Sequence, residues 1–369
     1  MHLKSLLLKN FRNYRDQQVQ LHSNFNFIFG KNAQGKTNLL EAIYYLGYLK
    51  SFRTSTRDHL LSRGGSTAVI EADVDIPPIS HQIRILFEAK KREVWLNKKR
   101  PQLFRDYYGL VPILLFEPGE VYLFRESPSQ RRRFMNQAVF LDYPPSLKTL
   151  RAYDEVLAQK NRILKEGGGS VALEIWNEQL VQLGARIIRQ RIEWIQKMSG
   201  EMEGEYRNLS LGGEKVMIRY DSSVPVLDKE MSEEKILEAL RLTVREKEGE
   251  EKRRGESVVG PHRDDFSLII DDRSVGEFGS QGENRSAIIA LKLSQIKLYE
   301  KEHQKTPIFL LDDVVSELDL GRTQGLFSTL QTTPGQVLIT ATEKSKLLSN
   351  FKEKGAYFLV EAGEVRVLG

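Results

Sequence analysis

The stretch Gly30-Lys31-Asn32-Ala33-Gln34-Gly35-Lys36-Thr37 follows Asn26-Phe27-Ile28-Phe29, which predicts a buried strand. After it, Leu39, Ile43 and Leu46 recur at the spacing of one helical face. A buried strand, a glycine-rich loop and a helix in this order are the context of the Walker A phosphate loop. Backbone N–H groups of such a loop close around phosphates, and the helix N-terminus adds a positive dipole end. The stretch predicts a P-loop nucleotide site in an α/β fold.

Two side chains of this loop have specific expected roles. Lys36 is expected to reach the β- and γ-phosphates of ATP, and Thr37 is expected to ligate Mg²⁺. The predicted ATP site contains Gly30, Lys31, Asn32, Ala33, Gln34, Gly35, Lys36, Thr37 and the next residue, Asn38. A glycine-rich turn before an ordinary helix is the competing interpretation, and the context favours the phosphate loop.

A second acidic motif follows the apolar run Pro307-Ile308-Phe309-Leu310-Leu311. The run is short and flanked by polar residues, which predicts a buried parallel strand. Ligands of open α/β sheets bind at the carboxyl ends of such strands, where Asp312 and Asp313 stand. We assign Asp312 to Mg²⁺ and Asp313 to the attacking water as general base. The alternative is an exposed Asp-Asp turn after a core strand. The Walker A motif elsewhere in the chain favours the functional interpretation.

Two further loops complete the order of motifs found in ABC-type ATPases. Phe278-Gly279-Ser280-Gln281-Gly282-Glu283 precedes a predicted helix and is similar to the ABC signature loop, with Glu283 where the common form has Gln. Ser280, Gln281 and Gly282 are expected to contact ATP, and Ser280 is counted among the catalytic residues because a hydroxyl at a helix N-terminus suits a γ-phosphate. In this superfamily that phosphate belongs to the partner protomer. Ser316-Glu317-Leu318-Asp319 stands at the place of the D-loop, with Asp319 expected near ATP and a helix cap by Ser316 as the competing account.

Composition narrows the class of protein. The 369 residues carry a net charge of +5, which raises the odds of an anionic partner such as nucleic acid. The chain has no cysteine, which excludes a disulfide scaffold and a thiolate zinc site. No apolar run approaches the ~18 residues of a membrane span. We expect a cytoplasmic protein without a membrane partner.

The ATPase motifs lie at both ends of the chain, and helical periodicity lies between them. Residues 147–164 and 173–187 repeat apolar positions at three-four spacing around Gly167-Gly168-Gly169, which predicts a helical hairpin. Residues 232–255 predict a charged helix. The expected architecture is an α/β ABC-type ATPase head with mixed β-sheets, formed by residues 1–140 and 255–369. A mostly helical lobe, residues 141–254, is inserted into it.

Several further stretches, taken together, resemble the RecF family. They are Leu8-Lys9-Asn10-Phe11-Arg12-Asn13-Tyr14, Ser51-Phe52-Arg53-Thr54, Phe116-Glu117-Pro118-Gly119-Glu120, Ser127-Pro128-Ser129-Gln130-Arg131-Arg132-Arg133-Phe134 and Gly260-Pro261-His262-Arg263-Asp264-Asp265. The resemblance runs from Leu8 to near Val365. Asn136 departs from an expected Asp, and Glu117 and Gly119 depart from the family pattern.

The resemblance implies a DNA-binding ATPase of recombinational repair with ATP and Mg²⁺ as cofactors. It implies a homodimer that forms with ATP, binds double-stranded DNA near gapped junctions, hydrolyses ATP slowly, and acts with RecR and RecO to load RecA. It places Arg53 near the nucleotide. Arg131, Arg132 and Arg133 are candidate contacts to DNA phosphates or to the nucleotide site, with a solvated first helical turn as the alternative.

Three other classes compete. A transporter nucleotide-binding subunit usually carries a His after the strand that follows Walker B, whereas Thr340-Ala341-Thr342 stands here. An SMC-like structural DNA clamp without turnover is disfavoured by the two retained carboxylates, and SMC proteins proper need much longer coiled coils. A small-molecule P-loop kinase would not need the signature loop.

Overall fold

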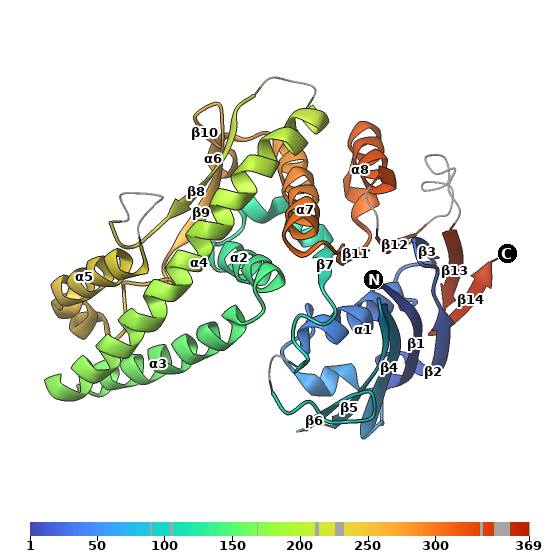
Figure 1. The fold of residues 1–369 in the computed structure, drawn as a ribbon, viewed down its shortest axis with the longest axis horizontal. Helices are drawn as coiled ribbons and strands as arrows, with labels where there is room; N and C mark the ends of the chain where they lie inside the picture. The colour runs from blue at the N-terminus through green and yellow to red at the C-terminus, as the bar shows by residue number, and fades with distance from the viewer. Residues whose placement is uncertain are drawn as a thin grey trace. The chain divides into compact units, whose positions relative to one another are not determined.

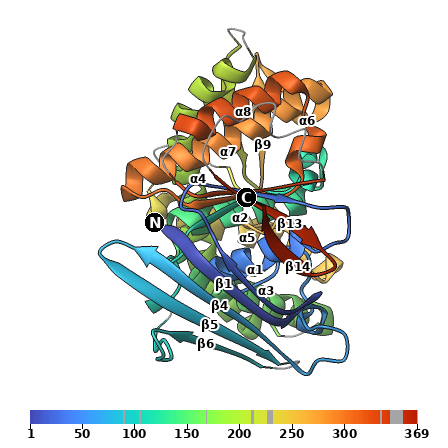
Figure 2. The ribbon, with the colours of Figure 1, turned by 90° about the vertical axis from the view of Figure 1, so that its right-hand side faces the viewer.

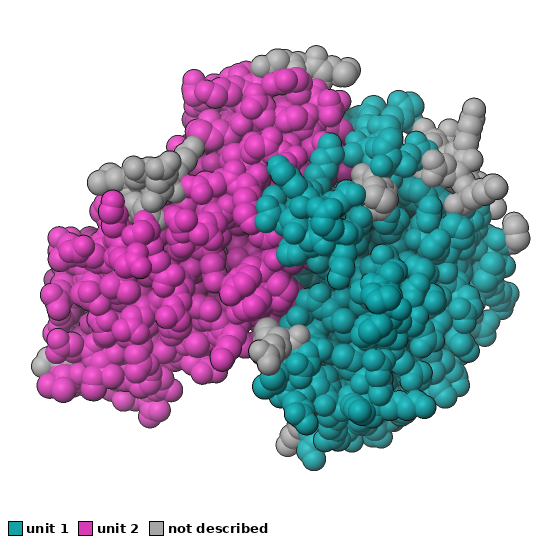
Figure 3. Space-filling view, in the orientation of Figure 1, with its two compact units in different colours: residues 1–121, 296–369 teal, residues 122–295 magenta. Residues whose placement is uncertain are grey.

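The computed structural model describes residues 1–88, 91–103, 106–167, 169–210, 214–225, 232–332, 335–342 and 355–368. The chain forms two compact units, residues 1–121 with 296–369 and residues 122–295, which Figure 3 colours separately. The predicted helical lobe, residues 141–254, lies wholly within the second unit. The lobe boundaries themselves stay a prediction.

A six-stranded sheet in the first unit carries the phosphate loop. Its order is β14-β13-β3-β12-β11-β7, parallel except for the β13–β14 pair. The strands are β3 (Phe25–Phe29), β7 (Ile113–Phe116), β11 (Ile308–Leu311), β12 (Val337–Ala341), β13 (Gly355–Glu361) and β14 (Glu364–Leu368). Every residue of β3, β7, β11 and β12 is buried, which explains why these strands are almost entirely apolar, with Asn26 and Thr340 as polar exceptions.

The other sheet of this unit is antiparallel, with order β2-β1-β4-β5-β6 (Figure 2). Its strands are β1 (His2–Phe11), β2 (Tyr14–Gln20), β4 (Thr67–Ile76), β5 (Ile79–Glu88) and β6 (Arg92–Leu96). Alternate residues of β4 and β5 are buried, as expected for a sheet with one covered face. Strands β5 and β6 pair antiparallel, with Ile85 opposite Val94.

Helices complete the first unit. They are α1 (Lys36–Tyr48) and α8 (Leu320–Thr332), with short 3₁₀ segments at Arg57–Leu60 and Val314–Glu317. Another 3₁₀ segment, Pro118–Arg125, spans the division between the units. Helix α1 begins directly after Gly35, so the phosphate loop leads into it without an intervening turn.

The second unit is mostly helical. It contains α2 (Pro128–Asp142), α3 (Ser146–Glu166), α4 (Ser170–Ser210), α5 (Glu233–Arg254) and the short α6 (Val275–Phe278). A three-stranded sheet, β10-β9-β8, joins β8 (Val216–Asp221), β9 (Asp265–Ile270) and β10 (Arg273–Ser274). Helix α7 (Gln281–His303) begins in this unit and ends in the first. Helices α3 and α4 pack against each other where the helical hairpin was predicted, and α4 extends to Ser210, well past residue 187 (Figure 1).

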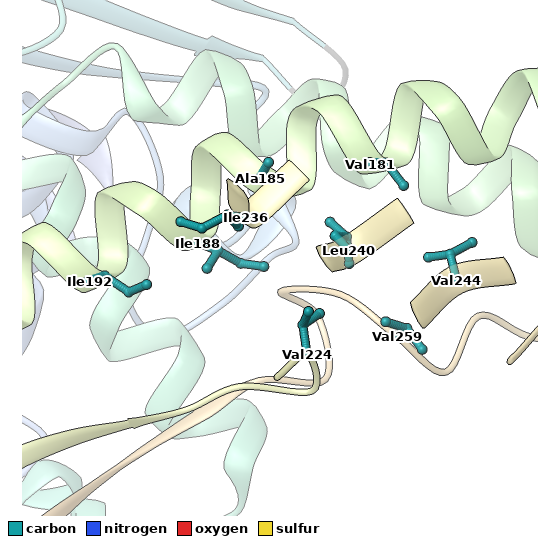
Figure 4. Packing of buried hydrophobic residues seen from close by; sticks show 9 residues of the cluster. All are labelled: Val181, Ala185, Ile188, Ile192, Val224, Ile236, Leu240, Val244 and Val259. Carbon is teal, nitrogen blue, oxygen red and sulfur yellow. The ribbon is translucent and has the colours of Figure 1, made fainter. Parts of the chain in front are cut away.

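Helices α4 and α5 pack through a stripe of aliphatic residues (Figure 4). One side repeats at three-four spacing on α4, and the other repeats every fourth residue on α5, so each helix presents one apolar face. The members are Val181, Ala185, Ile188, Ile192, Ile236, Leu240 and Val244, joined by Val224 and Val259. Among the helices of the described residues, none is long and apolar enough to cross a membrane.

Candidate nucleotide site

Two glycines of the phosphate loop occupy places that other residues cannot take. Gly30 has φ 152° and Gly35 has φ 124°. A Cβ atom on Gly30 would lie 2.3 Å from the Val360 carbonyl oxygen, and one on Gly35 would lie 2.6 Å from the Asn13 side-chain nitrogen. The backbone conformation therefore requires glycine at both positions, and at Gly30 the backbone carbonyl of Val360 also leaves no space for a side chain.

Lys36 is folded back onto its own loop. Its Nζ donates hydrogen bonds to the carbonyl oxygens of Gly30, at 2.6 Å, and Lys31, at 3.0 Å. The residue is only 6% exposed. Burial lowers the Lys36 pKa, and the nearby carboxylates of Asp313 and Asp312 oppose that shift. The ammonium group thus lies inside the curve of the loop, at the position where a phosphate-binding charge is needed.

The two carboxylates follow β11, which runs next to the central strands of the sheet. Asp312 is 5% exposed, and its Oδ1 accepts a hydrogen bond from the Thr37 hydroxyl at 3.0 Å. Burial raises the Asp312 pKa, while the hydrogen bonds from Thr340 and Thr37 lower it. Residues 275 positions apart are therefore in contact, as expected for Walker A and Walker B.

This pair fits magnesium. Hydroxyl and carboxylate oxygens are hard donors of the kind that Mg²⁺ takes beside a nucleotide, where phosphates and water complete the octahedron. Within the described ranges, no group of three or more His, Cys, Asp or Glu side chains forms a separate metal site. Thr37 and Asp312 are the residues that would hold the ion.

The family motif near the N-terminus supports the phosphate loop from the side. The Asn13 Nδ2 donates to the Gln34 carbonyl at 2.7 Å, and the Tyr14 hydroxyl donates to the Gly35 carbonyl at 2.8 Å. The turn between β13 and β14 also reaches the loop, because the Ala362 N–H donates to Gln34 Oε1 at 2.7 Å. Sequence reasoning recognised the motif but assigned no role to these side chains.

Arg53 lies beside the first turn of α1. Its Nη1 donates to the Asn38 Oδ1 at 2.7 Å, and it lies 4.0 Å from the Glu41 carboxylate. Glu41 is fully buried and accepts two bonds from Arg12, at 2.7 and 2.6 Å, and one from Ser51, at 2.5 Å. Glu41 was missed because a single acid within a helical pattern gives no signal in the sequence.

Asp319 caps helix α8. Its Oδ1 accepts the Arg322 N–H at 3.0 Å, and this backbone hydrogen bond is the main reason that the Asp319 pKa is lowered. The Ser316 hydroxyl instead donates to the Asp313 carbonyl at 2.6 Å. The helix cap therefore belongs to Asp319 and not to Ser316, because the helix begins at Leu320.

In the second unit, the signature loop forms a capping box at the start of α7. The Ser280 hydroxyl accepts the Glu283 N–H at 3.1 Å, and the Glu283 carboxylate accepts the Ser280 N–H at 2.6 Å. That bond to the backbone lowers the Glu283 pKa. Ser280 and Gln281 are exposed, and Gly282 is half-buried. Glu283 therefore caps the start of α7, a task that glutamine can also perform.

The stretch from Gly260 to Asp265 contributes polar side chains, His262 and the buried Asp264, to the interior of the second unit. His262 Nδ1 lies 2.7 Å from the Tyr153 hydroxyl, and its Nε2 lies 3.1 Å from the Ser257 carbonyl. Asp264 is fully buried and accepts bonds from Ser223 and Tyr220. These contacts give the stretch a structural role within the unit.

Asn136 is linked to the same stretch through Arg191. Its Oδ1 accepts a bond from Arg191 Nη2 at 2.8 Å, and Arg191 also donates to the Pro261 carbonyl at 2.7 Å. Arg191 is 2% exposed. The Asn136 amide oxygen therefore accepts the hydrogen bond that an aspartate carboxylate would accept, but the amide carries no negative charge.

The other two departures from the family pattern are Glu117 and Gly119. The Glu117 N–H donates to the Glu120 carboxylate at 3.1 Å, and a Cβ atom on Gly119 would meet nothing within 4 Å.

Acid is expected to weaken the second unit through His262. Burial lowers its pKa to about 4, so between pH 6.5 and 4 the unfolded chain takes up a proton that the folded chain does not. Stability is therefore lost as pH falls through this window, by up to about 3 kcal/mol. Denaturant unfolding across these pH values should show a shallower pH dependence for His262→Gln than for the wild type. Equal pH dependence would remove His262 as the cause.

The three arginines of α2 differ in environment. Arg131 forms a bidentate pair with Asp265, at 2.9 and 2.5 Å, and Arg132 donates to the Asp264 carbonyl at 3.0 Å. Hydrogen bonding to Asp265 raises the Arg131 pKa. Arg133 is exposed. Arg131 and Arg132 therefore bond other residues of the second unit and are not purely solvated. A role of the three arginines in DNA binding stays a prediction.

Comparison with known proteins adds independent information. The family model described as RecF/RecN/SMC N terminal domain matches residues 2–364. The chain is similar to the DNA replication and repair protein RecF of Syntrophotalea carbinolica, with 35% identity over 365 residues and 99% of each chain covered. Two solved structures of the recombination mediator protein RecF in the RecFOR pathway, RecF-ATPrS and RecF-ATP, are each 30% identical. Their TM-scores are 0.91 and 0.87, with all of this chain and 98% and 99% of theirs covered.

Proposed function

The chain belongs to the RecF family, and from that premise we propose that it is an ATPase whose ATP-dependent homodimer binds double-stranded DNA near single-strand gaps. Its fold is that of an ABC-type ATPase head. The observation that carries the proposal is the contact of Thr37 with Asp312, beside Lys36 inside the phosphate loop. Solved relatives carry ATP or a related nucleotide in their names.

Each residue of this site has a proposed task. Lys36 holds the β- and γ-phosphates by charge, and the loop N–H groups and the dipole of α1 add to it. Asp313 accepts the proton of the attacking water. Thr37 and Asp312 hold Mg²⁺, which neutralises phosphate charge when it is bound. Hydrolysis to ADP and phosphate is expected to be slow and stimulated by DNA.

A second protomer completes the proposed site. In a two-fold dimer, the signature loop of one protomer faces the phosphate loop of its partner. Ser280 offers a hydroxyl and a backbone N–H at a helix N-terminus, both suited to a γ-phosphate. In the single chain, the Glu283 carboxylate occupies that N–H. When the dimer closes on ATP, we expect the γ-phosphate to replace the Glu283 carboxylate at the Ser280 N–H.

The DNA and protein partners follow from the family. We propose double-stranded DNA and gapped junctions as the nucleic acid, and RecR, with RecO and RecA downstream, as the protein partners. The name RecFOR pathway in the solved relatives supports this assignment. The net charge of +5 is compatible with an anionic partner.

Sedimentation tests the proposal directly. The wild type is expected to be monomeric without nucleotide, to dimerise with ATP, and to sediment as a dimer on gapped duplex DNA. Lys36→Ala should weaken ATP binding or ATP-driven dimerisation at least tenfold, about 1.4 kcal/mol, because it removes the phosphate-binding charge. Lys50→Ala, an exposed lysine just after α1, is the matched control. A Lys36→Ala protein that binds ATP and dimerises normally would overturn the site assignment.

A further inference from the structure

A buried threonine lies between the two halves of the proposed site. Thr340 is fully buried and belongs to β12. In the sheet, β12 lies between β3, which leads into the phosphate loop, and β11, which leads into the two aspartates. Thr340 pairs with Ile28 of β3 one residue before the strands' shared end, so its height in the sheet is fixed by the ladder.

The hydroxyl of Thr340 contacts both aspartates. Its Oγ1 accepts the backbone N–H of Asp313 at 2.8 Å and lies 2.9 Å from Asp312 Oδ1. The Leu311 carbonyl lies farther away, at 3.4 Å. A hydroxyl has one proton and two acceptor sites, so it can donate to Asp312 and accept from Asp313 at the same time.

Each of these two hydrogen bonds stabilises the aspartate that takes part in it. Asp313 has φ 49°, in the left-handed region that non-glycine residues rarely occupy, and it keeps this conformation only where the surroundings hold it. The Thr340 oxygen holds its N–H. Asp312 is buried, and an ionised buried carboxylate needs donors, which Thr37 and Thr340 supply.

We propose that Thr340 is a positioning residue that orients Asp312 toward the metal ion and Asp313 toward the attacking water. The residue touches neither the nucleotide nor the reacting atoms in this assignment and acts through the aspartates. A single side chain on the central strand thereby fixes the two acidic groups relative to the phosphate loop. The inference rests on the proposed ATPase activity.

The test compares Thr340→Val with Thr340→Ser. Valine keeps the volume but loses the donor and the acceptor, whereas serine keeps both. Thr340→Val should lower kcat by about 10–100-fold, the usual effect of losing a partner of a metal-ligating carboxylate. It should also raise the Mg²⁺ concentration that gives half-maximal activity. The affinity for ATP without Mg²⁺ should change by less than about twofold, because Thr340 contacts the two aspartates and not the nucleotide. Serine should restore kcat and the Mg²⁺ dependence.

A matched control lies on α5 in the second unit. The Thr243 hydroxyl donates to the Ala239 carbonyl of its own helix at 2.8 Å, so Thr243→Val removes a hydroxyl outside the site and should keep the wild-type kcat and Mg²⁺ dependence. Thermal unfolding of each variant monitors the fold. If Thr340→Val does not fold, Thr340→Cys, which keeps a weak donor of similar size, takes its place with an intermediate loss expected.

Two different failures are distinguishable. A folded wild type that binds ATP but never hydrolyses it, with or without DNA, would end the proposed ATPase function and this inference with it. A wild type that turns over ATP, with Thr340→Val equal to it in kcat and Mg²⁺ dependence, would overturn the inference alone. Loss of activity in Thr340→Val that Thr340→Ser does not restore would show a packing effect and would also overturn it.

Discussion

Asp313→Asn is expected to bind ATP and Mg²⁺, to lose most of its hydrolysis, and to accumulate as an ATP-bound dimer on DNA. The amide keeps the shape of the carboxylate but cannot accept the proton of the attacking water. Loss of a general base lowers rates by about 10²–10⁴-fold. Because dimers are then formed but not consumed, the dimer fraction at a given ATP concentration should rise.

The backbone favours this substitution as a clean test. Asp313 has φ 49°, and asparagine is among the few residues that tolerate the left-handed region. The N–H that bonds Thr340 is also retained. Asp272→Asn is a matched control, because Asp272 is an exposed aspartate in the second unit with φ 63°.

Two measurements decide the outcome. Steady-state phosphate release gives the rate, and sedimentation with ATP and gapped DNA gives the dimer fraction. Normal phosphate release in Asp313→Asn would move the general base to another residue. Low release together with weak ATP binding would indicate that Asp313 acts on nucleotide binding instead.

The motifs of the site were visible in the sequence because each places a charged side chain, Lys36 or Asp312, directly after a buried strand or loop, where packing alone does not call for a charge. The stretches before Gly30 and Asp312 predicted two buried strands, and the sheet has them as β3 and β11, one on each side of β12. Helical spacing predicted the α3–α4 hairpin because its buried residues repeat with the helical period. The order of the strands in the parallel sheet could not be predicted, because no local sequence pattern records which strands lie side by side.

Contacts between distant segments were beyond reach. Asn13 and Tyr14 hold the phosphate loop through backbone carbonyls, and a carbonyl acceptor leaves no mark in a sequence. Glu41 and Thr340 are buried polar residues whose partners come from elsewhere in the chain. His262 and Asp264 had a recognisable motif, but the groups that they bond, on Tyr153, Ser257, Tyr220 and Ser223, lie outside it.

A dimer with one intact site can be built from two inactive chains. Lys36→Ala should disable the site that holds the chain's own nucleotide. Ser280→Arg should disable the site on its partner's nucleotide, by placing bulk where a γ-phosphate must fit. Ser280 is exposed, so the arginine has room in the single chain, although loss of the cap at α7 costs about 1 kcal/mol. Each homodimer then lacks both sites.

The mixed dimer differs from its parents. The Ser280→Arg protomer keeps Lys36, and the Lys36→Ala protomer keeps Ser280, so together they form one intact site. With equal and unbiased mixing, about half the dimers are mixed and about a quarter of wild-type sites return. DNA-stimulated ATPase should rise from near zero for each variant to roughly that fraction, or less if the two sites cooperate.

A control with the same two substitutions isolates their arrangement. When Lys36→Ala and Ser280→Arg are placed in one chain and paired with wild type, both sites of the mixed dimer carry a defect. Mixed dimers purified through two different tags allow the two arrangements to be compared at equal composition. Activity in the first arrangement and none in the second requires that the signature loop act on the partner's nucleotide. Equal activity in both would reject action across the interface, and substantial activity of Ser280→Arg alone would remove Ser280 from the site. If neither arrangement is active, only strict coupling between two intact sites would retain the trans model.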